Sequence, residues 1–141
     1  MSRVFLDSNL FIYLLEDPGP RGKRAAHIFS RLSDRGDLLL ISTLTVGETL
    51  IKPIESRNQA LETQYRSLFD DPGALVLPFD RKAGEMFALI RQNRTIKAPD
   101  AIQLATAAST KCDLFITNDD RLAMAIVPGI QFIVSMDRAP L

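Results

Sequence analysis

The chain has 141 residues, 46% of them hydrophobic and 24% charged, which is typical of one globular domain, here expected over residues 1–141. Its 17 basic and 17 acidic side chains cancel, which excludes a general attraction to nucleic acid or anionic membranes and leaves only local basic patches. The single cysteine, Cys112, excludes an internal disulfide, and no apolar run approaches the roughly 20 residues that cross a bilayer, so we expect a cytoplasmic protein without a membrane segment.

The N-terminal part of the sequence predicts two strands separated by helices. Val4–Leu6 predicts a buried strand, and a second apolar run, Leu10–Leu15, predicts a helix after the polar turn between them. Two prolines and two glycines in Asp17–Gly22 indicate a break in the chain. Residues 23–33 carry apolar side chains at helical spacing, and the continuous apolar run Leu38–Ile41 predicts a second strand, buried on both faces.

The middle of the sequence predicts three helices and one strand. Residues 42–52 are expected to form a helix that ends at Pro53, and residues 58–69 have apolar positions typical of a further helix. Ala74–Leu77 is a short apolar run that predicts the third strand. Residues 81–91 again place apolar side chains at helical spacing.

The C-terminal part predicts one long helix, a short helical segment and two strands. Ala98–Ser109 is rich in alanine, and Pro99 suits its first turn because no backbone donor is needed there. Leu114–Ile116 and Gln131–Val134 are the expected last strands, with a short helical segment over residues 121–125 between them. Strands that alternate with helices predict an α/β domain: a mainly parallel five-stranded sheet with helices on both faces.

Four acidic residues stand near the ends of predicted strands or at the start of helices. Asp7 follows the first strand, Glu48 lies in the helix after the second, Asp100 lies in the first turn of its helix, and Asp119 follows the fourth strand. Parallel strands end at the same edge of a sheet, where open α/β folds bind ligands. The four carboxylates are therefore expected to converge there.

Each acid also has a simpler structural explanation. Asp7 could be a helix N-cap, Thr45 and Glu48 have the spacing of a capping box, and Asp100 favours the start of a helix through the helix dipole. The acids after Thr117 could begin a short helix. Taken singly, these explanations are preferable, but four clustered carboxylates repel one another and require a cation.

The residue types restrict the chemistry of such a site. Carboxylates without neighbouring histidine or cysteine favour a hard ion such as Mg²⁺ or Mn²⁺, and His27 and Cys112 are too isolated to hold zinc. His27 is also the only candidate base for a serine nucleophile, and the chain has no glycine-rich phosphate loop. With these alternatives excluded, the residue types favour metal-assisted phosphoryl chemistry.

The segments FLDSNLFIYLL, TVGETL, PDAIQLATAA and FITNDDRL carry the four acids in this order, and together they resemble the PIN-domain nucleases. The likeness is greatest to the small VapC-type toxins of prokaryotic toxin–antitoxin pairs. It implies a parallel five-stranded sheet flanked by helices, and Mg²⁺- or Mn²⁺-dependent endoribonuclease activity on RNA. It also implies a cognate antitoxin partner and a homodimer.

The resemblance assigns roles to individual residues. It implies an acidic quartet with two polar residues in support. Our mechanistic hypothesis is that three of these acids hold the metal and that the other holds a second ion or orients the attacking water. The metal ligands are Asp7, Asp100 and Asp119, the fourth acid is Glu48, and the supporting residues are Asn9 and Thr117. Asp120 adjoins Asp119 and could take its place.

Basic residues beside the third acid are the candidates for binding RNA. Arg91, Arg94 and Lys97 precede Asp100 and could contact phosphates, although they could equally form a solvated helix face. Another basic group lies within residues 21–35.

Two other functions are compatible with parts of the pattern. A phosphatase that uses Asp7 as nucleophile requires a second acid two residues later, where Asn9 stands. A metal-binding RNA-binding module, or a receiver-like domain, would have an acidic pocket without turnover. A receiver would also have a lysine after a late strand, and Thr117 to Asp119 contain none.

Overall fold

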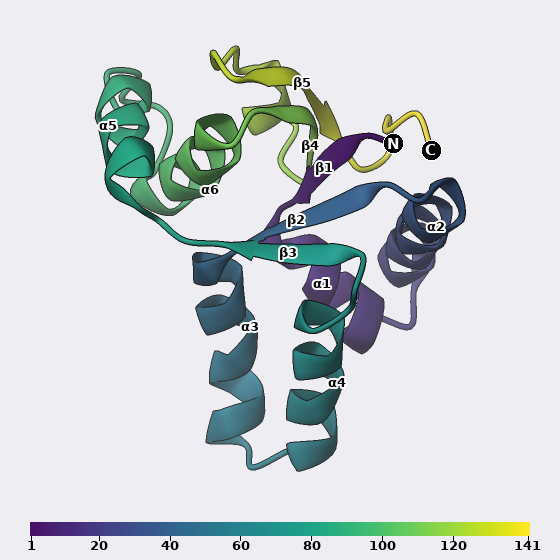
Figure 1. The fold of residues 1–141 in the computed structure, drawn as a ribbon. Coiled ribbons are helices and arrows are strands. Elements are labelled where there is room, and N and C mark those ends of the chain that lie inside the picture. Colours follow the sequence, from purple (N-terminus) through teal and green to yellow (C-terminus); the bar gives the residue numbers. More distant parts are fainter.

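A single parallel sheet of five strands forms the centre of the molecule (Figure 1). The computed structural model describes all residues, 1–141. The strand order is β3-β2-β1-β4-β5 and every neighbouring pair is parallel, which confirms the predicted fold class. The strands are β1 (Arg3–Leu6), β2 (Leu38–Ser42), β3 (Ala74–Leu77), β4 (Cys112–Thr117) and β5 (Ile130–Ser135).

Six α-helices flank the sheet, with α1 to α4 on one face and α5 and α6 on the other (Figure 1). The hairpin of α3 and α4 extends well beyond the sheet. None of these helices has the length and apolar character needed to span a membrane. The helices are α1 (Ser8–Glu16), α2 (Pro20–Arg35), α3 (Thr43–Glu55), α4 (Gln59–Phe69), α5 (Arg81–Ile90) and α6 (Ala98–Ser109), followed by the short 3₁₀ helix η1 (Leu122–Met124).

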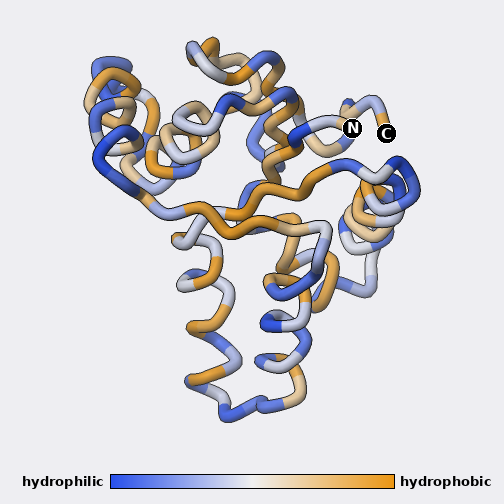
Figure 2. Tube along the Cα trace, in the orientation of Figure 1, coloured by the Kyte–Doolittle hydropathy of each residue, from blue (hydrophilic) through white to orange (hydrophobic).

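Side chains on the two faces of each strand belong to two separate hydrophobic clusters. In β1, Phe5 points to the α5–α6 side and stacks on Phe115 of β4 with ring centroids 5.0 Å apart. Its neighbours Val4 and Leu6 pack on the opposite side against α1 and α2. Burial on both faces explains why the strands read as continuous apolar runs in the sequence, and Figure 2 shows these runs in the middle of the molecule.

The predicted break at Asp17–Gly22 is shorter than expected, because α2 already begins at Pro20. Proline is tolerated in the first turn of a helix, where its missing N–H has no partner to lose. A Cβ atom on Gly22 would lie 1.7 Å from the carbonyl oxygen of Asp17, so only glycine allows α1 and α2 to approach this closely. The two breaking residue types therefore serve a tight connection between helices.

The prediction that Pro53 ends its helix was wrong. Proline removes one helical hydrogen bond, yet α3 continues through Pro53 to Glu55. Pro53 is buried, and the backbone pairing resumes directly after it, since the amide of Ser56 donates to the carbonyl of Lys52 at 3.0 Å. Burial of the ring and this late position in the helix offset the lost bond.

Candidate functional site

Three strands bring polar residues to the carboxyl edge of the sheet. The strand order reverses at the central strand β1: the chain adds β2 and β3 on one side of it and then crosses over to add β4 and β5 on the other. Asp7 directly follows β1, Ser42 ends β2, and Thr117 ends β4. Open α/β sheets form their ligand crevices at such a point.

A cavity of about 380 Å³ opens at this edge, and it brings together all four predicted acids. None of the side chains around it is a large apolar one. They are Asp7, Ser8, Asn9, Glu48, Pro99, Asp100, Gln103, Asn118, Asp119, Asp120 and Arg121. Residues more than 100 positions apart in the chain thus share one polar cavity.

Asp7 forms the floor of the cavity and is only 8% exposed. One carboxylate oxygen accepts a hydrogen bond from the backbone N–H of Ser8 at 2.8 Å, and the other accepts one from the Thr117 hydroxyl at 3.0 Å. Burial raises the pKa of Asp7 to about 6, against these two hydrogen bonds, and the charges of Asp100 and Glu48 act in the same direction as burial. Asp7 is the N-cap of α1 as well as a cavity residue, so both explanations of its position hold.

Glu48 lies in the second turn of α3, and the predicted capping box is absent. The N-cap of α3 is Ser42, whose hydroxyl oxygen accepts a hydrogen bond from the backbone N–H of Thr45 at 3.0 Å. Thr45 is completely buried inside the helix. Glu48 is therefore not needed as a cap, and its Oε1 instead accepts a hydrogen bond from the Ser8 hydroxyl at 2.8 Å.

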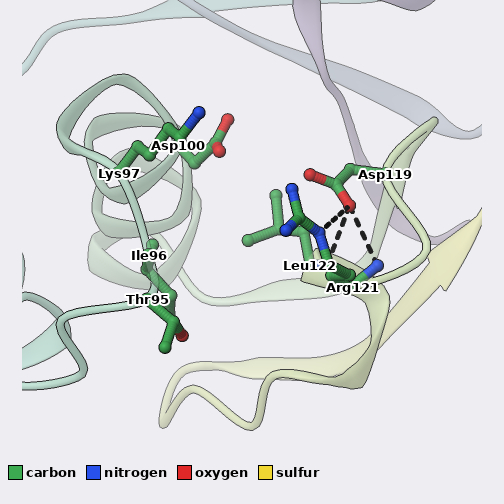
Figure 3. Close-up of a pocket in the computed structure, with 7 residues that line it drawn as sticks. All are labelled: Thr95, Ile96, Lys97, Asp100, Asp119, Arg121 and Leu122. Carbon is green, nitrogen blue, oxygen red and sulfur yellow. Dashed lines mark hydrogen bonds and ion pairs between the residues drawn. The ribbon is translucent and has the colours of Figure 1, made fainter.

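Asp100 and Asp119 face each other across the open side of the cavity (Figure 3). Asp100 lies in the first turn of α6, and its pKa is raised by burial and next by the charge of Asp119. Both also line a smaller adjoining cavity of about 140 Å³ together with Lys97 and Arg121, which lower the pKa of Asp100. Asp120 lines only the larger of these two cavities, which favours Asp119 over Asp120 as the acid that the turn after β4 contributes.

Asp119 also has a local structural role. Its Oδ1 accepts hydrogen bonds from the backbone N–H groups of Arg121, at 2.9 Å, and Leu122, at 3.4 Å, so that it orders the turn into η1. This is the short helical start that the sequence suggested. The second carboxylate oxygen points away from the turn (Figure 3).

The two predicted supporting residues differ in their contacts. The Thr117 hydroxyl donates to Asp7 and accepts from the backbone N–H of Asp119 at 3.1 Å, so it joins two of the acids. The exposed Asn9 lines the cavity but bonds to none of the acids, and its side-chain amide donates to Asn118 Oδ1 at 3.0 Å. Asn9 therefore positions the loop after β4.

Of the predicted RNA-binding residues, only Lys97 lines either cavity. Arg91 donates to the carbonyl of Ile96 at 2.5 Å and so stabilises the loop before α6, while Arg94 is exposed away from both cavities. Arg121, which the sequence analysis did not single out, lines both. Arg121 directly follows Asp119 and Asp120 in the turn after β4, and this position in the sequence could have indicated that it lies at the site.

A group of buried polar side chains behind Glu48 was also missed. Gln103 of α6 is 2% exposed and contacts Ser8, Ser42 and Thr45. In the sequence it is the one large polar residue on the buried side of an alanine-rich helix, three positions after Asp100, which was a readable signal.

The residues around the larger cavity offer oxygen ligands only. Carboxylate, amide and hydroxyl oxygens suit Mg²⁺ or Mn²⁺, and neither His27 nor Cys112 lines the cavity. As the side chains lie, no three His, Cys, Asp or Glu residues are close enough together to hold an ion. Asp7 and Asp100 nonetheless line one space, and burial together with the charges of neighbouring carboxylates raises the pKa of each. The residue types therefore fit a hard divalent ion.

The fold is similar to that of several solved structures, among them a toxin–antitoxin complex and a toxin. VapBC2 from Rickettsia felis, bound to a DNA fragment of its promoter, is similar with a TM-score of 0.75 and 12% identity, over 94% of this chain and 97% of that one. A toxin–antitoxin complex from Klebsiella pneumoniae has a TM-score of 0.69 and 24% identity, over 90% and 94% of the two chains. VapC20 from Mycobacterium tuberculosis, a sarcin-ricin loop cleaving toxin, has a TM-score of 0.70 and 14% identity, over 89% and 97%.

No curated protein sequence matches the chain. The sequence model of the PIN domain matches residues 4–126, which include the four acids and the carboxyl ends of β1 to β4. This match covers most of the chain and agrees with the structural similarities. The chain therefore belongs to the PIN domain family.

Proposed function

We propose that this protein is a divalent-metal-dependent endoribonuclease and the toxin of a type II toxin–antitoxin pair. The observation that carries the proposal is the polar cavity at the end of β1, lined by acids from four separate segments of the chain. Membership in the PIN domain family and similarity to a sarcin-ricin loop cleaving toxin support nuclease activity.

The acids divide into metal ligands and a residue for water. Asp7, Asp100 and Asp119 would hold Mg²⁺ or Mn²⁺, and Glu48 would accept a hydrogen bond from the attacking water. When bound, the ion would supply a water of lowered pKa and neutralise charge on the scissile phosphate. Thr117 would keep Asp7 and Asp119 in fixed orientation by bonding to both.

Lys97 and Arg121 are the basic residues best placed to contact RNA. Both line the smaller adjoining cavity, Lys97 just before α6 and Arg121 in the turn after β4 (Figure 3). Since the chain has no net charge, these two local cations would supply the attraction for phosphates next to the acidic floor.

An antitoxin partner is supported by the assemblies in which the similar structures occur. These include the Klebsiella pneumoniae toxin–antitoxin complex and VapBC2. We extend this to a cognate antitoxin that covers the cavity, and to a homodimer of the toxin.

Cleavage of RNA by the purified protein tests the proposal directly. We expect cleavage with Mg²⁺ or Mn²⁺, none with a chelator, and a loss of at least about a hundredfold in Asp7→Asn and Asp100→Asn. Asp34→Asn, which changes an exposed acid of α2, is the control and should leave cleavage intact. Wild-type turnover in both cavity variants would end the proposal.

The same protein separates the two alternatives. RNA binding without any cleavage, under every metal condition, would identify a binding module. Release of phosphate from an aryl phosphate, with Asp7→Asn inactive, would identify a phosphatase instead.

A further inference from the structure

The side-chain amide of Gln103 is buried in α6, directly behind the proposed active site. Its Nε2 donates one hydrogen bond to the Ser8 hydroxyl at 2.8 Å and one to the Thr45 hydroxyl at 2.9 Å, and its Oε1 accepts from the Ser42 hydroxyl at 2.5 Å. A buried amide costs free energy unless it is hydrogen-bonded, and an apolar residue would fill this position of an alanine-rich helix at lower cost. Its presence calls for a function beyond packing.

Gln103 fixes the direction of the hydrogen bonds around it. The Ser42 hydroxyl has two acceptors within reach, Gln103 Oε1 at 2.5 Å and Thr45 Oγ1 at 3.2 Å, and the shorter contact assigns its one proton to Gln103. The two amide protons of Gln103 occupy lone pairs of Ser8 and Thr45. The Thr45 proton then has Ser8 Oγ as its partner, at 2.8 Å. The proton that remains, that of Ser8, points to Glu48 Oε1 at 2.8 Å.

The chain of hydrogen bonds ends on an exposed acid that has no other hydrogen bond. Glu48 is solvent-exposed, and its long side chain has several rotatable bonds. The Ser8 hydroxyl is the one hydrogen-bond donor to it within the protein. The charge of Glu48 acts on both Asp7 and Asp100, so it would act equally on a cation held between them. The orientation of Glu48 thus matters for the site, and Ser8 alone holds it.

We propose that Gln103 is a positioning residue for Glu48, which acts by forcing the Ser8 hydroxyl to donate to that carboxylate. The importance of Glu48 for the ion rests on the proposed function, whereas the hydrogen-bonded chain does not. Gln103 also ties together the start of α1, the start of α3 and the interior of α6. It therefore fixes Glu48 relative to Asp7 and Asp100, which belong to the first and third of these elements.

Affinity for Mn²⁺ alone, measured by calorimetry on the apoprotein, tests this role. In Gln103→Met, which keeps the length of the side chain and removes its polar atoms, we expect about tenfold weaker binding. Thr106→Val is the matched control, because Thr106 is equally buried in α6 but its hydroxyl donates to the carbonyl of Ile102 in the same helix, at 2.7 Å. This control should bind Mn²⁺ like the wild type.

A double-mutant cycle with Glu48→Gln distinguishes positioning from general damage to the fold. If Gln103 acts through Glu48, Gln103→Met should change the affinity by less than twofold when Glu48 is already replaced. The same tenfold loss in both backgrounds, or no loss in Gln103→Met, would overturn the proposal.

Ser42→Ala provides the same test should Gln103→Met fail to fold. It removes the donor to Gln103 Oε1, and with it the hydroxyl oxygen that caps α3 at the Thr45 N–H, from a residue outside the cavity lining. It should weaken Mn²⁺ binding in the wild type but not in Glu48→Gln. Cleavage assays on these proteins separate the two proposals. If the wild type binds Mn²⁺ but does not cleave RNA, the proposed ribonuclease function is rejected, and the double-mutant cycle still decides on the role of Gln103. If the wild type does not bind Mn²⁺, both the ribonuclease function and the role of Gln103 are overturned.

Discussion

Replacement of the buried acid Asp7 by asparagine should stabilise the metal-free protein at neutral pH while it destroys the site. Burial raises the pKa of Asp7 from 3.8 to about 6, so the folded protein holds this proton over a range in which the unfolded chain has released it. The favourable contribution of the protonated group is complete below pH 4 and is lost as the pH rises through 6. Above that, the protein folds around an unfavourable buried charge.

The size of the effect follows from the pKa. A difference of about 2 units corresponds to roughly 3 kcal/mol at 1.36 kcal/mol per unit. Asparagine can still accept a hydrogen bond from the Ser8 N–H. Its NH₂ group, however, replaces the oxygen to which the Thr117 hydroxyl donates in the wild type, and the loss of this hydrogen bond costs about 1 kcal/mol. The net gain at neutral pH is about 2 kcal/mol, or roughly 4–8 °C in Tm.

Urea unfolding with a chelator present, at pH 8 and at pH 4, measures this gain. Asp7→Asn should exceed the wild type by about 2 kcal/mol at pH 8 and should be level with it or less stable by about 1 kcal/mol at pH 4. Mn²⁺ should then stabilise the wild type and leave the variant unchanged. A variant less stable than the wild type by the same amount at both pH values would refute the reasoning, since the buried charge would then cost nothing.

Three further predictions concern the same cavity. Mn²⁺ affinity should fall as the pH drops below about 6, because protonation of Asp7 competes with the ion; calorimetry at pH 5 and 7.5 measures this. Thr117→Val removes the hydroxyl that bonds to Asp7 and should lower kcat by about 10- to 100-fold with KM for RNA little changed in steady-state cleavage. Lys97→Ala and Arg121→Ala should each weaken RNA binding and reduce its salt slope by about one, whereas Arg94→Ala should not, as filter binding over a salt series would show.

The fold and the acidic residues could be predicted because their signals are local. Each strand buried on both faces leaves a continuous apolar run, and parallel pairing then determines that Asp7 and Asp119 lie at one edge. The position of Asp100 follows from Pro99, which marks the first turn of a helix. Short sequence windows hold all of this information.

What could not be predicted depends on contacts between distant segments. Pro53 remains helical because its ring is buried, and burial is not visible in the local sequence. Thr45 and Glu48 have the spacing of a capping box, but Ser42, where β2 ends, takes the cap and releases Glu48 to the cavity. The contacts of Gln103 join residues up to 95 positions apart, so no window of the sequence contains them.

The two positions expected of Asp7, helix N-cap and lining of the cavity, are one arrangement. An N-cap lies where a helix begins, and in this sheet α1 begins at the carboxyl end of the central strand, so a capping carboxylate is necessarily at the floor of the cavity. The N–H of Ser8 and the hydroxyl of Thr117 occupy one site on each oxygen and hold the group in place without neutralising it. Burial disfavours the negative charge that remains on Asp7, and a divalent ion would neutralise it. The free energy of unfolding that the metal-free protein loses through this buried charge would therefore be recovered on metal binding.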